Sequence, residues 1–139
     1  MIQVILGDKG TGKTKRLIDM TNDALKVEHG DIVFIDDDKR YMYDLRHEIR
    51  FVDASEYAEK FSAEAFLAFV SGMLSANFDI SVIAVDAFKK LVFTPLDAPE
   101  TKALFAGLEK LSQEHKCSFI LSVSESEENV PEYISKYAL

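Results

Sequence analysis

The residues of this chain that are best suited to chemistry lie near its start. Residues 7–14 read Gly-Asp-Lys-Gly-Thr-Gly-Lys-Thr and match the pattern G-x-x-x-x-G-K-[ST]. Glycines in such a loop let the backbone turn tightly enough to direct successive N–H groups at phosphate oxygens. A helix that begins at the lysine adds the positive end of its dipole beneath the anion. The pattern therefore predicts a loop that binds phosphate groups.

Each position of this loop has an expected role. Lys13 is expected to reach the β- and γ-phosphates of a nucleotide, and the Thr14 hydroxyl is expected to ligate Mg²⁺. The predicted phosphate-binding set comprises Gly7, Asp8, Lys9, Gly10, Thr11, Gly12, Lys13 and Thr14. The loop follows the apolar run Ile2–Leu6 and opens an amphipathic segment. This is the strand–loop–helix context that the motif requires.

Short apolar runs alternate with amphipathic segments along the whole chain. The runs are predicted to be strands at Ile2–Leu6, Ile32–Ile35, Ile80–Val85 and Ser118–Val123, with a weaker edge-strand candidate at Ile49–Val52. Continuous apolarity of this kind is typical of parallel strands that are covered on both faces.

The amphipathic segments are predicted to be helices. They run from Lys13 to Glu28, from a Ser62 cap to Asn77, from a capping box at Asp97–Glu100 to His115, and onward from Pro131. This order predicts an α/β fold, a three-layer α/β/α sandwich with a mostly parallel sheet of about five strands. Residues 1–139 are expected to form a single P-loop nucleotide-binding domain.

The composition limits the classes of partner. Sixteen Lys and Arg stand against twenty-four Asp and Glu, a net charge of −8, so general nucleic-acid binding is not expected. The single cysteine, Cys117, forms no internal disulfide, and no Cys/His cluster suggests a metal site. The first residues lack a charged signal-peptide region, and the most apolar stretch, Ala63–Phe78, is too polar to span a bilayer. We therefore expect a cytoplasmic protein that does not contact membranes.

The loop resembles the Walker A motif of the P-loop NTPase superfamily, and the element order is similar to that of its RecA-like division. Residues 82–86, Val-Ile-Ala-Val-Asp, look like a Walker B strand. The resemblance implies that Asp86 holds Mg²⁺ through water on the side opposite Thr14. Thr14 and Asp86 are therefore the implied metal ligands.

The same resemblance implies a position for the strand Ser118–Val123 between the first strand and the Walker B strand. In that division, the end of this strand offers a polar side chain to the γ-phosphate. The corresponding residue is Ser124, or Ser122 if the strand ends earlier. The implied catalytic residues are Lys13, Asp86 and Ser124.

Two departures from the family pattern predict slow hydrolysis. Ala87 occupies the position where many members carry a glutamate that activates water. Asp36–Asp38, at the end of the second strand, could supply that base, as a neighbouring strand end does in several RecA-like ATPases, or could form a solvated turn. No arginine follows Arg50, whereas ring-forming relatives commonly carry an arginine finger in that half. The missing charge could come from Arg40, Arg46 or Lys89–Lys90, or from a protein partner or a second copy in a homo-oligomer.

One basic and aromatic cluster follows the second predicted strand. It contains Arg40, Tyr41, Tyr43, Arg46 and Arg50. Guanidinium and aromatic faces could grip the phosphate or base of a second substrate, as in a nucleotide kinase. The alternative is a surface loop that balances nearby aspartates through exposed ion pairs. A zinc-bearing lasso like that of thymidine kinases is excluded, because its cysteines are absent.

Together these patterns predict a Mg²⁺-dependent ATP-binding protein and weak ATPase. The alternatives are a nucleotide-dependent interaction module without significant turnover and a small-molecule phosphotransferase. ATP is favoured over GTP because no segment matches the guanine-reading Asn/Thr-Lys-x-Asp motif. The chain as a whole resembles small bacterial P-loop proteins that are sometimes labelled twitching-motility ATPases. True pilus ATPases are far longer and carry signature boxes that this sequence lacks.

Overall fold

The computed structural model describes residues 1–139 and places five strands in one sheet. The strands are β1 (Ile2–Gly7), β2 (Asp31–Asp36), β3 (Arg50–Asp53), β4 (Ile80–Val85) and β5 (Ser118–Ser124). All neighbouring strands are parallel, and their order is β1-β5-β4-β2-β3. Strand β5 therefore lies between β1 and β4, as the resemblance implied, and β3 forms an edge, as predicted.

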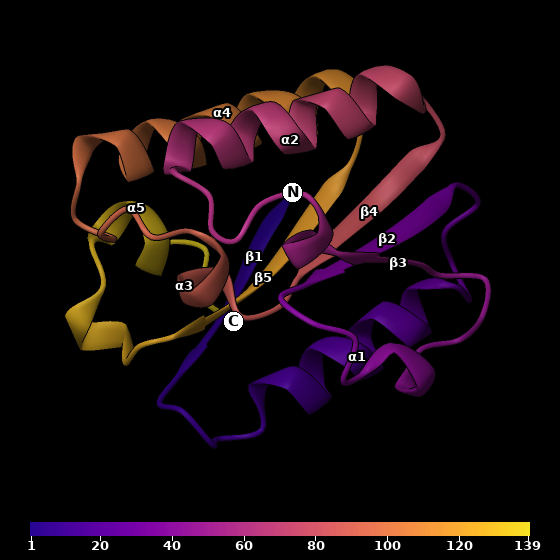
Figure 1. The fold of residues 1–139 in the computed structure, drawn as a ribbon, viewed down its shortest axis with the longest axis horizontal. Helices are drawn as coiled ribbons and strands as arrows, with labels where there is room; N and C mark the ends of the chain where they lie inside the picture. The colour runs from indigo at the N-terminus through magenta and orange to yellow at the C-terminus, as the bar shows by residue number, and fades with distance from the viewer.

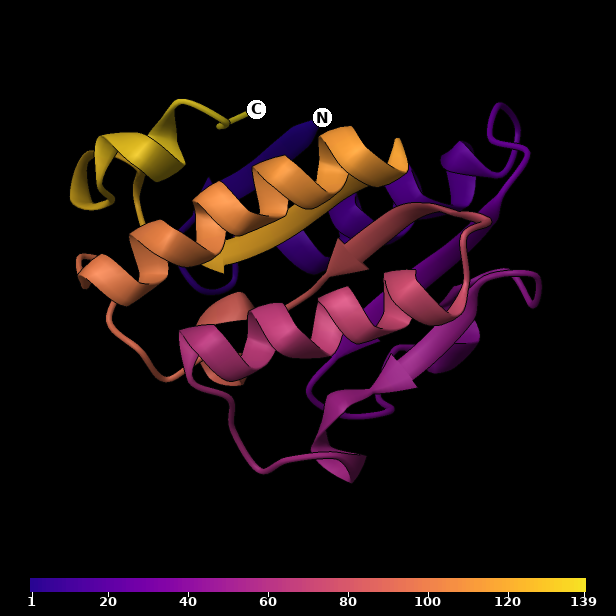
Figure 2. The ribbon, with the colours of Figure 1, turned by 90° about the horizontal axis from the view of Figure 1, so that it is seen from above.

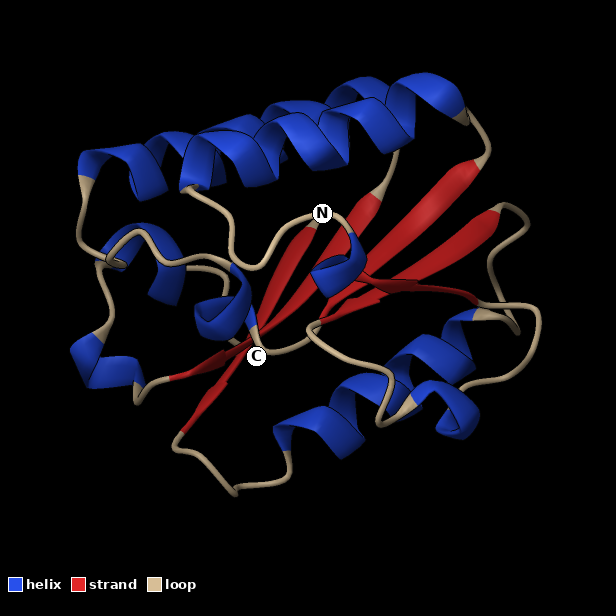
Figure 3. Cartoon of the chain, viewed as in Figure 1, coloured by secondary structure: helices blue, strands red, loops and turns tan.

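Helices cover both faces of this sheet, which confirms the predicted three-layer α/β/α sandwich (Figure 3). The helices are α1 (Lys13–Ala24), α2 (Ala63–Ala76), α3 (Phe88–Leu91), α4 (Pro99–His115) and α5 (Glu132–Ser135). Single 3₁₀ turns lie at η1 (Met42–Asp44), η2 (Ala54–Glu56) and η3 (Glu127–Asn129). Helices α2 and α4 run side by side over one face, and α1 covers the other (Figures 1 and 2). No helix combines the length and apolarity needed to cross a bilayer.

Two apolar clusters, one on each side of the sheet, explain why the strands are apolar throughout. The cluster beneath α2 and α4 contains 25 buried residues, and the cluster beneath α1 contains 10. Along β4, Ile83 and Val85 join the larger cluster, whereas Val82 and Ala84 join the smaller one. Successive side chains of a strand point to opposite faces, so both sets had to be apolar.

The register of the sheet aligns three polar residues at the carboxyl ends of its central strands. The last registered pairs are Ile35 with Val85 and Val85 with Leu121. Asp36, Asp86 and Ser122 each follow one residue later, so they lie next to one another across the three strands. Alternation along β4 puts Asp86 on the same face as Val82 and Ala84, which is the α1 face. The three polar side chains therefore point toward the beginning of α1.

The ends of the helices differ in part from the sequence predictions. Ser62 caps α2 as predicted, accepting a hydrogen bond from the Ala65 N–H at 3.1 Å. The predicted capping box at Asp97–Glu100 is wrong, because Ala98, which has no side-chain acceptor, occupies the N-cap of α4. Helix α1 ends at Ala24 and is shorter than the predicted segment.

Candidate functional site

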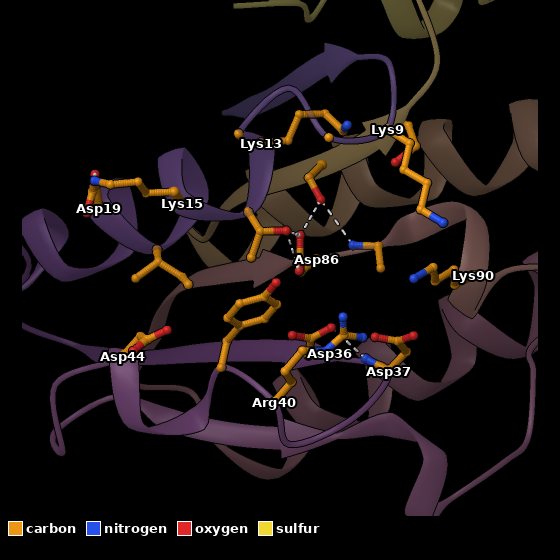
Figure 4. A pocket seen from close by; sticks show the side chains of 18 of the residues that line it. Lys9, Lys13, Lys15, Asp19, Asp36, Asp37, Arg40, Asp44, Asp86 and Lys90 are labelled. Carbon is orange, nitrogen blue, oxygen red and sulfur yellow. Dashed lines mark hydrogen bonds and ion pairs between the residues drawn. The ribbon is translucent and has the colours of Figure 1, made fainter.

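A cavity of about 780 Å³ opens at the carboxyl ends of the strands. Its lining residues come from four segments, which are the loop and α1 within residues 9–22, the end of β2 and the following turn within residues 36–44, residues 86–90 after β4, and the end of β5 within residues 122–124. Figure 4 shows the side chains that converge on it from these segments. Parallel α/β sheets bind their ligands at this edge, so the position of the cavity agrees with a ligand site.

The loop after β1 is shaped by glycines and leaves the first turn of α1 open. Gly10 and Gly12 have φ angles of 84° and 82°, in the left-handed region that other residues rarely adopt. Gly12 is the N-cap of α1, and no side chain caps the helix there. The first N–H groups of α1 are therefore available to an anion.

Lys13 is the buried cation of the loop, with 8% of its surface exposed. Its Nζ donates to the Asp8 carbonyl oxygen at 2.8 Å, and the Thr11 hydroxyl donates to the same oxygen at 2.7 Å. Burial lowers the pKa of Lys13, and the negative charges of Asp86 and Asp8 oppose that shift. The hydrogen bond to Asp8 therefore holds the ammonium group of Lys13 over the loop.

The predicted metal ligands meet in the structure. The Thr14 hydroxyl lies 3.1 and 3.2 Å from the two carboxylate oxygens of Asp86, which is 3% exposed. The Ser122 hydroxyl donates to Asp86 Oδ1 at 2.6 Å and accepts the Ala87 N–H at 3.0 Å. This carboxylate and hydroxyl converge at the mouth of the loop of residues 7–14, and as hard oxygen ligands they fit Mg²⁺.

Asp36 is the polar residue of the site whose burial the sequence did not reveal. It is 1% exposed, so a solvated turn is the wrong description of this residue, although Asp37 and Asp38 are only half-buried. Asp36 Oδ1 accepts the Asp37 N–H at 2.8 Å, whereas Oδ2 is buried without a hydrogen-bond partner. Burial and the negative charges of Asp86 and Asp37 raise the pKa of Asp36 to about 8. Only the register that places Asp36 beside Asp86 indicates this burial, and the sequence alone does not give that register.

The two serines proposed as a γ-phosphate sensor occupy different positions. Ser122 is buried against Asp86, whereas Ser124 is exposed at the end of β5 and makes no side-chain hydrogen bond. Both serines line the cavity. Ser122 is therefore the residue that the structure couples to Asp86.

The predicted phosphate-binding set divides into lining and supporting residues. Its lining members are Lys9, Gly10, Gly12, Lys13 and Thr14. The other members, Gly7, Asp8 and Thr11, lie outside the lining and shape the loop. For example, the Gly7 N–H donates to the Glu125 carbonyl oxygen at 2.9 Å, which ties the end of β1 to the segment after β5.

The basic and aromatic cluster after β2 also divides. Arg40 and Tyr41 line the cavity, and Arg40 forms a 2.9 Å ion pair with Asp38. The guanidinium of Arg40 also lies 5.4 Å from the centre of the Tyr41 ring. The members that lie outside the cavity lining are Tyr43, Arg46 and Arg50. The cluster thus contributes one side of the cavity and does not form a separate anion site.

Comparison with known proteins supports the fold. No family model matches the sequence, and no curated protein is significantly similar to it. The flagellar accessory protein FlaH from Methanocaldococcus jannaschii has a similar structure, with a TM-score of 0.61 and 14% identity over 97% of this chain. The match covers 65% of the FlaH chain. At this identity the likeness shows the fold alone, a RecA-like parallel α/β sandwich, and does not extend to the bacterial twitching-motility label.

Proposed function

We propose that this protein binds ATP with Mg²⁺ in the cavity at the loop of residues 7–14. The observation that carries the proposal is the convergence of Lys13, Thr14 and Asp86 at the open end of α1. One cation, one hydroxyl and one buried carboxylate supply the groups that a metal-bound triphosphate requires. The RecA-like fold provides the same arrangement of strand, loop and helix.

The charges around the cavity suggest the orientation in which a nucleotide would bind. Lys9 and Lys90 lie at one end, with Asp37 beside Lys90 (Figure 4). Asp19 and Asp44 lie at the other end, where Asp19 pairs with Lys15. We assign the phosphates to the end of Lys9 and Lys90, which form no ion pair, beside Lys13. The ribose and base then extend toward the carboxylates, which can accept hydrogen bonds from sugar hydroxyls or base amino groups. ATP remains the preferred nucleotide because the guanine-reading motif is absent.

Slow hydrolysis is the reaction that the site supports. Water attacks the γ-phosphorus, the bond to the bridging oxygen breaks, and its electron pair remains on the β-phosphate of ADP. Asp36 Oδ2, buried without a partner beside the metal ligands, is the candidate acceptor of the water proton. A pKa of about 8 leaves most of this carboxyl protonated at neutral pH, which limits the rate.

The same observation favours one second candidate function. If Asp36 stays protonated, the site can bind the nucleotide without hydrolysing it at a significant rate. The protein would then act as an interaction module that signals to a protein partner or to a second copy. The phosphotransferase reading is weaker, because Arg46 and Arg50 do not reach the cavity wall.

Equilibrium binding of a fluorescent ATP analogue in the presence of Mg²⁺ tests the proposal. We expect Lys13→Ala to weaken binding by at least about tenfold, because the lysine neutralises phosphate charge. Lys26→Ala is the matched control, since Lys26 lies beyond the end of α1, is exposed and pairs only with Asp23. Equal affinities of the wild type and a folded Lys13→Ala protein would refute the assignment of the loop.

A further inference from the structure

The cations that line the cavity differ in whether a carboxylate already holds them. Lys15 pairs with Asp19 at 3.0 Å, and Arg40 pairs with Asp38 at 2.9 Å. In the same way, Lys89 pairs with Glu125 at 2.9 Å, and the Glu125 side chain is 27% exposed.

Two lining lysines, Lys9 and Lys90, form no ion pair and no side-chain hydrogen bond. Both are exposed. Besides the buried Lys13, they are therefore the lining cations that can approach a ligand without first leaving a carboxylate.

Buried neighbours fix the position of the Lys90 backbone. The side chains of Phe88 and Leu91 are 0% and 3% exposed, so the short helix α3 is anchored on that side and presents Lys89 and Lys90 outward. Phe88 packs edge-on against two other core phenylalanines, at centroid distances of 6.0 and 5.8 Å. The Lys90 N–H donates to the Ala87 carbonyl oxygen at 2.9 Å, which closes the turn of α3.

The turn that carries Lys90 is tied directly to the metal ligand. Ala87 has a φ of 54°, a left-handed conformation that is strained for a residue with a Cβ. Its N–H is held by the Ser122 hydroxyl at 3.0 Å, and that hydroxyl donates to Asp86 at 2.6 Å. The geometry that positions Asp86 therefore also positions the start of α3.

The side chain of Lys90 lies at the phosphate end of the cavity. Figure 4 shows it on the side of Asp86 toward Lys9 and Asp37, away from Asp19 and Asp44. Hydrogen bonds from Arg40 lower the pKa of the nearby Asp38, and the charge of Lys90 adds to that effect. Lys90 is thus close to the carboxyl end of β2 as well as to that of β4.

From this arrangement, and resting on the proposed nucleotide function, we propose that Lys90 is a catalytic residue that neutralises the γ-phosphate from within the same chain. Its ammonium group contacts the γ-phosphate oxygens and stabilises the negative charge that they carry in the transition state. Lys90 transfers no proton. The reaction itself is the hydrolysis described above. The bond between the γ-phosphorus and the bridging oxygen breaks, and ADP retains the electron pair. Lys89 remains bound to Glu125 during this step.

The test compares binding and chemistry in wild type, Lys90→Ala, Lys90→Arg, Lys89→Ala and Lys102→Ala. Affinities for Mg²⁺·ADP and for a non-hydrolysable Mg²⁺·ATP analogue are measured together with the single-turnover rate of ATP cleavage. Lys102, an exposed residue of α4 outside the cavity, controls for loss of surface charge. Because Lys90 is exposed, its variants are expected to fold, which circular dichroism verifies.

We expect Lys90→Ala to lower the single-turnover rate at least about tenfold, since removal of one preorganised group costs about 10²–10³ in other sites. The variant should also bind the triphosphate analogue more weakly while its ADP affinity stays within about twofold of wild type. Lys90→Arg should restore most of the rate, and Lys102→Ala should resemble wild type. If the wild type binds nucleotide without turnover, the ratio of triphosphate to diphosphate affinity tests the proposal instead. That ratio should then be lower in Lys90→Ala than in the wild type.

Several results would overturn the proposal. One is a Lys90→Ala protein with wild-type rate and wild-type triphosphate affinity. Another is an equal loss of ADP affinity, which would make Lys90 a general binding residue. A rate that depends on Lys89, or on protein concentration and not on Lys90, would assign the charge to the neighbouring lysine or to a second copy. Failure of the wild type to bind either nucleotide would refute the proposed function itself, and with it this role.

Discussion

Asp86 is shared by two hydroxyls at the centre of the site, those of Thr14 and Ser122. An asparagine at position 86 can still accept hydrogen bonds from both hydroxyls at its one oxygen, but it lacks the second acceptor oxygen and the charge that a divalent cation requires. We expect Asp86→Asn to weaken nucleotide binding about 10–100-fold in Mg²⁺ and far less in EDTA. Titration calorimetry under both conditions provides the measurement. Equal losses with and without the metal would reduce Asp86 to a residue that ends a strand.

Asp36 makes the stability of the protein depend on pH. Burial raises its pKa from 3.8 to about 8, so as pH rises the unfolded chain releases this proton before the folded protein does. The contribution of Asp36 to the free energy of unfolding therefore falls between these pH values and stays constant above them.

An uncharged side chain at this position should remove that dependence. We expect Asp36→Asn to be more stable than wild type at pH 9 by at least about 1.4 kcal/mol, the equivalent of one pKa unit. Near pH 4 the difference should nearly vanish, because the wild-type carboxyl is then protonated in the folded state. Urea unfolding in EDTA at both pH values measures the effect. Parallel pH profiles of the two proteins would contradict the assigned environment of Asp36.

At the scale of elements, α3 depends on the burial of Phe88 between α2 and α4, where it contacts Phe66 and Phe105. We expect Phe88→Ala to lower the free energy of unfolding by about 3–5 kcal/mol through the cavity that it leaves. Phe93→Ala should cost less than about 1 kcal/mol, because 60% of that side chain is exposed. Denaturant titrations of both variants provide the comparison. Similar losses would place the anchor of α3 elsewhere.

The sequence predicted where the elements lie better than how they end. Apolar runs such as Ile80–Val85 identify strands because both faces of the sheet are covered, and Ser62 identifies a cap because its hydroxyl has an N–H to satisfy. At α4, Asp97 and Glu100 have the spacing of a capping box, but the backbone places Ala98 at the N-cap. A shift of one residue along the chain is enough to separate a capping pattern from its function.

At the scale of the whole molecule, the order of the strands decides which polar residues meet. The motif around Lys13 and its likeness to a known superfamily were sufficient to predict that Thr14 and Asp86 lie at one site, although not that their side chains would be hydrogen-bonded. The burial of Asp36 could not be predicted in this way. Three consecutive aspartates suggest a turn, and only the register of β2 beside β4 places the first of them within the sheet.

A crystal structure with Mg²⁺ and a non-hydrolysable ATP analogue tests the central claim most directly. We expect the triphosphate at the loop of residues 7–14, with Lys13 on its β- and γ-phosphates and the base directed toward Asp19 and Asp44. The Thr14 hydroxyl should ligate the ion at about 2.0–2.1 Å, with the Asp86 carboxylate beside it. A loop without phosphate at saturating analogue, or an analogue bound elsewhere on the protein, would contradict the assignment.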